Sequence, residues 1–205
     1  MKKALFLSCL AAATGLLTTP AWAQSANLTD WAKLGDAVVT AGSASLSTAF
    51  NDESPASGTG ALDYLAFEPA LGLAYDSLGG DSFDGSALRH SFKALAHTTL
   101  RFNWSLSTDS FDPAYADRAF VALDGQVLVL GSVATGAVSG SFSHSFAAGG
   151  SHDLAFGVVD VNDVLGVSTL TVDGVSVTAV PEPLSAALLL AGLGGLAVAA
   201  RRRRD

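Results

Sequence analysis

A strict alternation of apolar and polar residues at positions 99–106 restricts the fold of this chain more than any other feature. Every second residue from Leu100 to Leu106 is apolar, and the residues between them are polar. Successive side chains of a β-strand point to opposite faces, so this pattern predicts a strand with one buried face. Residues 141–146 repeat the pattern and predict a second strand of the same kind.

Two Asp-Gly pairs separate further short apolar runs. Asp124-Gly125 lies between residues 120–123 and 126–130, and Asp173-Gly174 lies between residues 169–172 and 175–178. Asp-Gly suits the positive φ angles of a two-residue hairpin turn. We therefore expect a β-hairpin at each pair.

One stretch, residues 61–67, has the spacing of a short helix, which Pro69 is expected to end. Gly, Ser, Thr and Asp fill the segments between the apolar runs. Short strands, regular turn signals and one minor helix predict an all-β fold, a single antiparallel β-sandwich of jelly-roll type at residues 28–179.

The N-terminus has the three parts of a secretory signal. Two lysines precede an apolar stretch at residues 4–17, and Ala21 and Ala23 form a small-x-small cleavage motif. We expect a signal peptide at residues 1–23, with a lipoprotein site at Cys9 as the less favoured alternative. Cleavage after Ala23 removes the only cysteine and excludes disulfides and thiolate metal sites from the mature protein.

The body of the chain is strongly acidic. Residues 25–180 contain five basic and seventeen acidic residues, a formal charge of −12, against −8 for the whole chain. Contacts with nucleic acid require clustered Lys and Arg, so this composition argues against a nucleic-acid partner.

The C-terminus combines three signals in order. Pro181, Glu182 and Pro183 precede an uncharged apolar run at residues 184–200, and four arginines, Arg201, Arg202, Arg203 and Arg204, follow it. The run is at the short end of what spans a bilayer. Arginines after such a run hold the C-terminus in the cytoplasm and act as a membrane stop. A membrane helix over residues 184–200 is expected.

This tail, residues 180–205, resembles the PEP-CTERM sorting domain of bacterial exported proteins. The resemblance implies a precursor held transiently in the membrane by the C-terminal helix and processed near Pro181–Pro183 by an exosortase, an integral-membrane transpeptidase. It implies export machinery and exosortase as partners, and hosts that make exopolysaccharide and biofilm. A plain C-terminal anchor that is never processed is the alternative.

The body resembles, less specifically, a recurrent domain of PEP-CTERM proteins. The matching stretches are residues 61–71, 99–108, 119–125 and 157–175. Such domains look like jelly rolls of the kind found in carbohydrate-binding and adhesive modules. The resemblance implies architecture and a surface location, and it specifies no ligand.

No catalytic set is visible in the sequence. The four histidines show no HExxH spacing, and neither a G-x-S-x-G elbow nor a P-loop occurs. We therefore assign no catalytic residues and expect no enzymatic activity and no resident cofactor. Aromatic residues offer another route to a ligand, because exposed aromatic rings can stack on sugar rings. The candidates are Trp31, Trp104, Tyr64, Tyr75 and Tyr115, of which Trp104 is expected in the core and Tyr115 is the better candidate.

Two groups of carboxylates remain as candidate sites. Asp160, Asn162 and Asp163 follow a predicted strand and offer oxygen ligands that suit Ca²⁺, although the spacing is not that of an EF-hand. The alternative is a purely structural role, in which these side chains form hydrogen bonds with the backbone of their own turn. Asp112, Tyr115 and Asp117 lie together in a predicted loop and form a candidate glycan contact.

These features predict an exported cell-surface or extracellular-matrix protein, structural or adhesive, that is associated with polysaccharide and processed by the exosortase system. A secreted jelly-roll enzyme acting on carbohydrate, with carboxylates from residues 109–117, is the alternative from a different class. Turnover of a glycan would distinguish the two.

Overall fold

The computed structural model describes residues 23–110, 112–162, 166–178 and Gly192 of the 205-residue chain. The strands all belong to one unit, Trp22–Val180. The predicted signal peptide, apart from Ala23, and the predicted membrane helix at residues 184–200, apart from Gly192, lie outside the described residues. Within the described ranges, no helix is long and apolar enough to cross a membrane.

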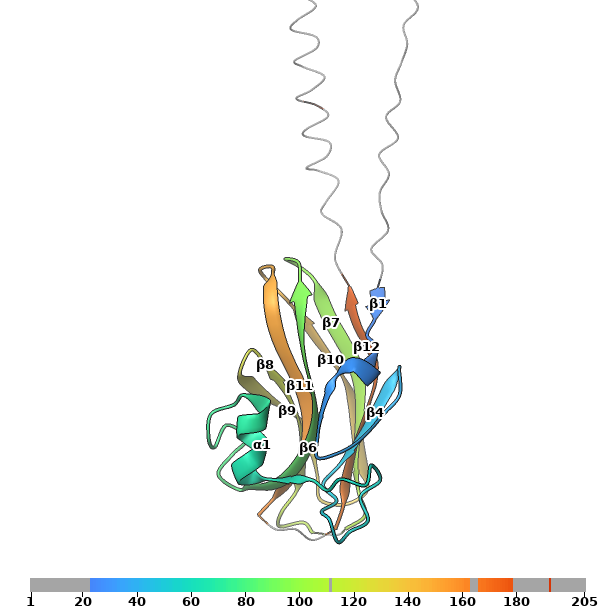
Figure 1. Cartoon of the computed structure of the whole chain (residues 1–205), viewed down its shortest axis with the longest axis vertical. Helices are drawn as coiled ribbons and strands as arrows, with labels where there is room; N and C mark the ends of the chain where they lie inside the picture. Colours follow the sequence, from blue (N-terminus) through green and yellow to red (C-terminus); the bar gives the residue numbers. More distant parts are fainter. Residues whose placement is uncertain (1–22, 111, 163–165, 179–191, 193–205) are drawn as a thin grey trace, which may run out of the picture. The chain divides into compact units, whose positions relative to one another are not determined.

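Two antiparallel sheets make up the domain (Figure 1). Sheet A contains, in spatial order, β10 (Ala137–Ser145), β7 (Thr99–Thr108), β12 (Ser168–Thr178), β4 (Ser43–Ser47) and β3 (Asp36–Val39), and β1 (Ala23–Ser25) also pairs with β12. Sheet B contains β2 (Ala32–Leu34), β6 (Ser82–Ala94), β11 (Gly150–Val161), β8 (Asp117–Leu123) and β9 (Gln126–Val133), and β5 (Leu62–Asp63) also pairs with β6. The predicted antiparallel β-sandwich is confirmed.

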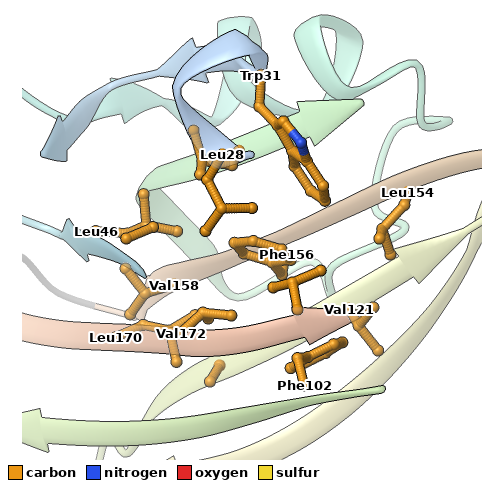
Figure 2. Close-up of a cluster of buried hydrophobic side chains, with 14 of the residues drawn as sticks. Leu28, Trp31, Leu46, Phe102, Val121, Leu154, Phe156, Val158, Leu170 and Val172 are labelled. Carbon is orange, nitrogen blue, oxygen red and sulfur yellow. The ribbon is translucent and has the colours of Figure 1, made fainter. Parts of the chain in front are cut away.

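The main core lies between the two sheets. Alternate residues of β6, β7, β8, β11 and β12 point into it, which is the packing expected of a sandwich. Figure 2 shows part of this core, in which Trp31 points toward Phe156. The two rings are 5.3 Å apart between centroids. Trp31 follows a short 3₁₀ helix, η1 (Leu28–Asp30), whose Leu28 is fully buried.

A second apolar cluster covers the outer face of sheet B. The short helix α1 (Tyr64–Leu71) lies on that face (Figure 1). Its Phe67 and Leu71 pack with the residues of β6, β8 and β11 that point away from the main core. As a result, β8 and the C-terminal part of β11 are buried on both faces. The outer face of sheet A carries mainly Ser, Thr, Arg and Asn side chains in β7 and β10.

The strand predicted from strict alternation is confirmed as β7. Leu100, Phe102 and Leu106 are buried, and the residues between them are largely exposed. Trp104 is half-buried, because its indole lies at the side of the sandwich over Gly131 and Gly140, where a Cβ atom would overlap the ring. Residues 141–145 belong to the second predicted strand, β10.

The two Asp-Gly pairs have different outcomes. Asp124 and Gly125 have φ angles of 51° and 79° and join β8 to β9, which confirms the first hairpin. The second hairpin prediction is wrong. Asp173 and Gly174 form a bulge within the single long strand β12, with φ of 62° at Gly174. Residues on both sides of this bulge pair with β7, so the chain continues instead of reversing.

The helix lies further along the chain than expected. Residues 62–63 form β5, and α1 begins at Tyr64 because the Asp63 side chain accepts a hydrogen bond from the Ala66 N–H. Pro69 lies inside the helix rather than ending it. Proline there removes one hydrogen bond, and the helix ends two residues later, before Gly72 in the left-handed conformation.

Candidate functional site

The candidate site lies beside α1, on the side of sheet B that faces away from the main core. Phe67 fixes the position of the helix: its ring lies so close to Gly85 of β6 that a Cβ atom there would stand 2.3 Å from it. The same ring meets the edge of Phe120, with centroids 6.0 Å apart. With Phe67 and Leu71 buried, Tyr64 and Leu65 are left at the solvent surface.

A buried carboxylate shapes the loop that follows the helix. Glu68 is 4% exposed, and its two oxygens accept hydrogen bonds from the Asp76 and Leu78 backbone N–H groups, both at 2.7 Å. Hydrogen bonds of this charge-assisted kind are stronger than those between neutral groups. Buried Leu73 and Leu78 anchor the loop on either side. The loop therefore presents Tyr75 outward, with 63% of it exposed.

Three exposed aromatic side chains gather at this point. Tyr64 comes from α1, Tyr75 from the loop and Phe83 from β6. The Tyr64 ring centroid lies 6.4 Å from that of Tyr75 and 6.3 Å from that of Phe83. We call the cavity of about 260 Å³ beside them the aromatic pocket; it is lined by Tyr64, Glu68, Tyr75, Asp76, Gly79, Gly80, Ser82 and Phe83.

The electrostatics of the aromatic pocket are negative. Its lining contains the carboxylates of Glu68 and Asp76 and no Lys, Arg or His. The nearest described cation is Arg118, whose guanidinium forms an ion pair with Asp81 and donates to the Ser82 hydroxyl at 3.3 Å. Partial desolvation, followed by the negative charge of Asp76, raises the pKa of the Tyr75 phenol. The Tyr75 phenol therefore stays protonated at physiological pH.

The carboxylates and tyrosine expected from the sequence to contact a glycan do not form one surface. Tyr115 is exposed, but Asp117 is buried at the start of β8, where it accepts hydrogen bonds from the Val161 N–H at 3.2 Å and from the Ser168 hydroxyl. Asp112 accepts a hydrogen bond from the Ala114 N–H within its own turn. The structure thus separates the three side chains between the protein surface and its interior.

The residues expected to hold calcium are also divided. Asp160 is 2% exposed, and burial, followed by the charge of Asp117, raises its pKa to about 9. Asn162 is exposed and has a φ of 63°, and Asp163 lies outside the described residues. Among the residues with described positions, no group of three or more His, Cys, Asp or Glu side chains is arranged to hold a metal ion. The calcium site stays a prediction.

The residues assigned to sorting also lie largely outside the described part of the chain. These are Ala21, Pro181, Glu182, Pro183 and the four arginines at 201–204. Ala23, the residue before the predicted cleavage point, begins β1 and pairs with Thr178 of β12. Their roles stay predictions from the sequence.

A larger cavity of about 380 Å³ opens beside η1, between Trp31, His90 and Phe92. Of its aromatic rings, Trp31 is 6% exposed and stacks on His90 with centroids 5.0 Å apart, and His90 and Phe92 are half-buried. Sugar rings need aromatic faces that water also reaches. The rings of the smaller aromatic pocket are exposed, whereas those of the larger cavity are buried or half-buried.

The sequence pointed to Tyr64 and Tyr75 as residues that would stack on a sugar if exposed, and both are exposed and adjacent to each other. Phe83, Glu68 and Asp76 were not singled out. Phe83 lies in an apolar-polar strand and has no distinguishing local pattern. Tyr75-Asp76 before Gly79-Gly80 is the one local signal, because an aromatic residue in a Gly-rich loop is more often exposed than buried.

Comparison with known proteins identifies the C-terminus. Residues 179–204 match the model of the PEP-CTERM protein-sorting motif. This match confirms the resemblance found in the sequence and indicates an exported protein that is processed by an exosortase. No protein with a curated function matches the chain.

Solved structures with a similar arrangement of strands share little sequence with this chain. A CBM4 domain has 12% identity and a TM-score of 0.38, covering 73% of this chain and 94% of its own. The N-terminal cellulose-binding domain of Cellulomonas fimi β-1,4-glucanase C has 11% identity and a TM-score of 0.38, covering 77% and 93%. TmCBM61, solved with β-1,4-galactotriose, has 13% identity and a TM-score of 0.30, covering 47% and 63%. Similarity at this level does not specify a ligand.

Proposed function

We propose that this exported protein is a non-enzymatic, polysaccharide-binding component of the cell surface or extracellular matrix, and that the aromatic pocket is its binding site. The observation that supports this most is the grouping of Tyr64, Tyr75 and Phe83 at the surface. They are 39%, 63% and 41% exposed, whereas most aromatic side chains of the described domain are buried or half-buried.

The chemistry of the aromatic pocket suits a sugar. Aromatic rings pack on the C–H faces of a pyranose, and large exposed rings provide contact area with little loss of side-chain entropy. The Asp76 carboxylate and the two phenol hydroxyls supply hydrogen-bonding groups for sugar hydroxyls. Ligand pockets for drug-sized molecules are roughly 300–1,000 Å³. A volume of about 260 Å³ therefore suits one or two sugar units.

Weak contact with one or two units still retains a protein on a polymer. A polysaccharide repeats the same unit many times, so a protein that dissociates from one unit is close to many equivalent units and binds again. Binding of this kind suits an adhesive or structural role, where the protein needs to remain in the matrix without converting it chemically.

Binding of the mature protein to polysaccharides, measured by titration calorimetry, tests this proposal. The double substitution Tyr64→Ala with Tyr75→Ala is expected to weaken binding about tenfold or more, since each aromatic contact contributes ~0.5–1.5 kcal/mol. Tyr115→Ala is the matched control, because Tyr115 is 43% exposed but does not line the aromatic pocket. Loss of binding in Tyr115→Ala alone would place the site in the 112–117 loop and refute the proposal.

The same samples distinguish binding from catalysis. A binding protein leaves the glycan intact after prolonged incubation. Release of shorter saccharides that stops in Asp112→Asn or Asp117→Asn would favour the enzyme alternative. In the folded protein, Asp117 is engaged in internal hydrogen bonds, and this supports the non-enzymatic assignment.

A further inference from the structure

The aromatic pocket has a charge that restricts the sugars it accepts. Its two carboxylates, Glu68 and Asp76, play different parts. Each oxygen of Glu68 accepts a hydrogen bond from a backbone N–H group, and the residue is 4% exposed, so Glu68 contributes chiefly negative charge. Asp76 is exposed, and none of the described side chains or backbone groups donates a hydrogen bond to its carboxylate. Asp76 therefore retains an acceptor for a ligand.

The lining of the aromatic pocket contains no Lys, Arg or His, although Arg118 donates a hydrogen bond to the lining residue Ser82. Arg118 is the nearest guanidinium, and its charge is paired with Asp81. The body as a whole carries a formal charge of −12. A sugar with a carboxylate or sulfate group would be repelled here, both by Asp76 and by the surrounding field.

The three aromatic rings also favour a positively charged ligand, as the carboxylates do. The face of an aromatic ring carries partial negative charge and attracts cations within about 6 Å of its centroid. Tyr64, Tyr75 and Phe83 line one cavity, and Asp76 belongs to the same lining. Aromatic rings combined with a carboxylate are the arrangement with which proteins bind ammonium groups.

Resting on the proposed function, we infer that the aromatic pocket selects a sugar that carries a protonated amine, so that its polymer is an amino-sugar polysaccharide with free amino groups. The sugar ring packs on the aromatic side chains, and the ammonium group lies against the ring faces and the Asp76 carboxylate. A neutral glycan retains only the packing of its sugar ring on the aromatic side chains. An anionic glycan also lacks the ammonium contact, and Asp76 repels it.

A pair of oligosaccharides that differ only in acetylation tests this inference. We would titrate the mature protein with a glucosamine hexamer and with the N-acetylglucosamine hexamer, at a mildly acidic pH and low salt. Binding of the free-amine form is expected to be on the order of tenfold tighter, with the difference shrinking in high salt. Asp76→Asn should remove most of the difference between the two affinities, whatever its effect on binding of the acetylated form.

Asp52→Asn is the control for net charge, because Asp52 is an exposed carboxylate outside the lining of the aromatic pocket. It should leave the preference intact. Equal affinity for the two hexamers, or a preference that survives Asp76→Asn, would overturn the inference. If the protein binds neither hexamer but binds another glycan, and Tyr64→Ala weakens that binding, the amino-sugar inference is overturned and the proposed function stands. If the protein binds no glycan, the inference and the proposed function are both refuted.

Discussion

At the scale of single residues, the least usual group is the Asp160 carboxyl. Burial, and then the charge of Asp117, raises its pKa to about 9, while a hydrogen bond from Thr48 opposes the shift. Its ordinary pKa is 3.8. At neutral pH the folded protein therefore holds a proton on Asp160 that the unfolded chain releases. Because the folded pKa is the higher one, this stabilisation is complete below about pH 4 and is lost as the pH rises through about 9.

The prediction is a melting temperature that falls between about pH 7 and pH 9. Asp160→Asn is neutral at every pH, so it should flatten this fall. Asp84, whose pKa burial raises to about 6, titrates below this range and does not confuse the result. Asp173→Asn, which changes an exposed carboxylate of β12, serves as the control. An unchanged slope in Asp160→Asn would show that Asp160 is ionised in the folded protein.

The calcium prediction can be tested on the same residue. A cation bound by Asp160 and its neighbours would replace the proton and stabilise the folded state. If the site exists, millimolar Ca²⁺ raises the melting temperature of the native protein, and Asp160→Asn abolishes the rise. An unchanged melting temperature at millimolar Ca²⁺ would refute the predicted calcium site.

At the scale of elements, the site depends on how closely α1 approaches β6. The Phe67 ring lies directly on Gly85, whose missing side chain leaves the space for it. Any Cβ atom at position 85 requires the ring, and with it the helix, to move. Tyr64 lies on that helix and Phe83 lies two residues before Gly85, so this contact sets the position of Tyr64 relative to Phe83.

Gly85→Ala is therefore expected to affect both stability and binding. Overpacking of this kind destabilises a protein by ~1–3 kcal/mol, as measured by urea unfolding. Glycan binding should weaken in parallel, although position 85 does not line the aromatic pocket. Gly42→Ala is the control, because a Cβ atom there meets no atom within 4 Å. Unchanged glycan binding by Gly85→Ala would show that the contact between Phe67 and Gly85 does not position the aromatic rings.

The local sequence pattern determines some of the strands and turns of this fold but not all of them. The strand β7 and the hairpin at Asp124-Gly125 were predictable, because alternation and turn chemistry are properties of adjacent residues. The bulge at Asp173-Gly174 was not, since the same dipeptide turns or continues according to whether strands pair on both sides of it. The aromatic pocket could not be predicted from the sequence either. Tyr64, Tyr75 and Phe83 come from three different segments, and their proximity depends on how α1 packs.

At the scale of the whole molecule, the sandwich and the sorting signal are separate in the sequence. The strand β12 ends at Thr178, and the match to the PEP-CTERM motif begins at residue 179. The strand β1 pairs with the last residues of β12, so Ala23 lies beside Thr178.

Deleting residues 181–205 should therefore leave the fold unchanged and alter the destination. The truncated protein is expected to have the melting temperature of the native mature protein and the same affinity for glycan. In a host with a working exosortase, its processing and location should differ from those of the full chain. A full-length C-terminus found by mass determination in the membrane of such a host would contradict exosortase processing.

Mapping of chemical-shift changes by NMR shows directly whether the aromatic pocket binds polysaccharide. On titration with a bound oligosaccharide, we predict that the largest changes fall on Tyr64, Tyr75, Asp76 and Phe83. Changes concentrated instead on Trp31, His90 and Phe92 would place the ligand in the larger cavity beside η1 and contradict the account.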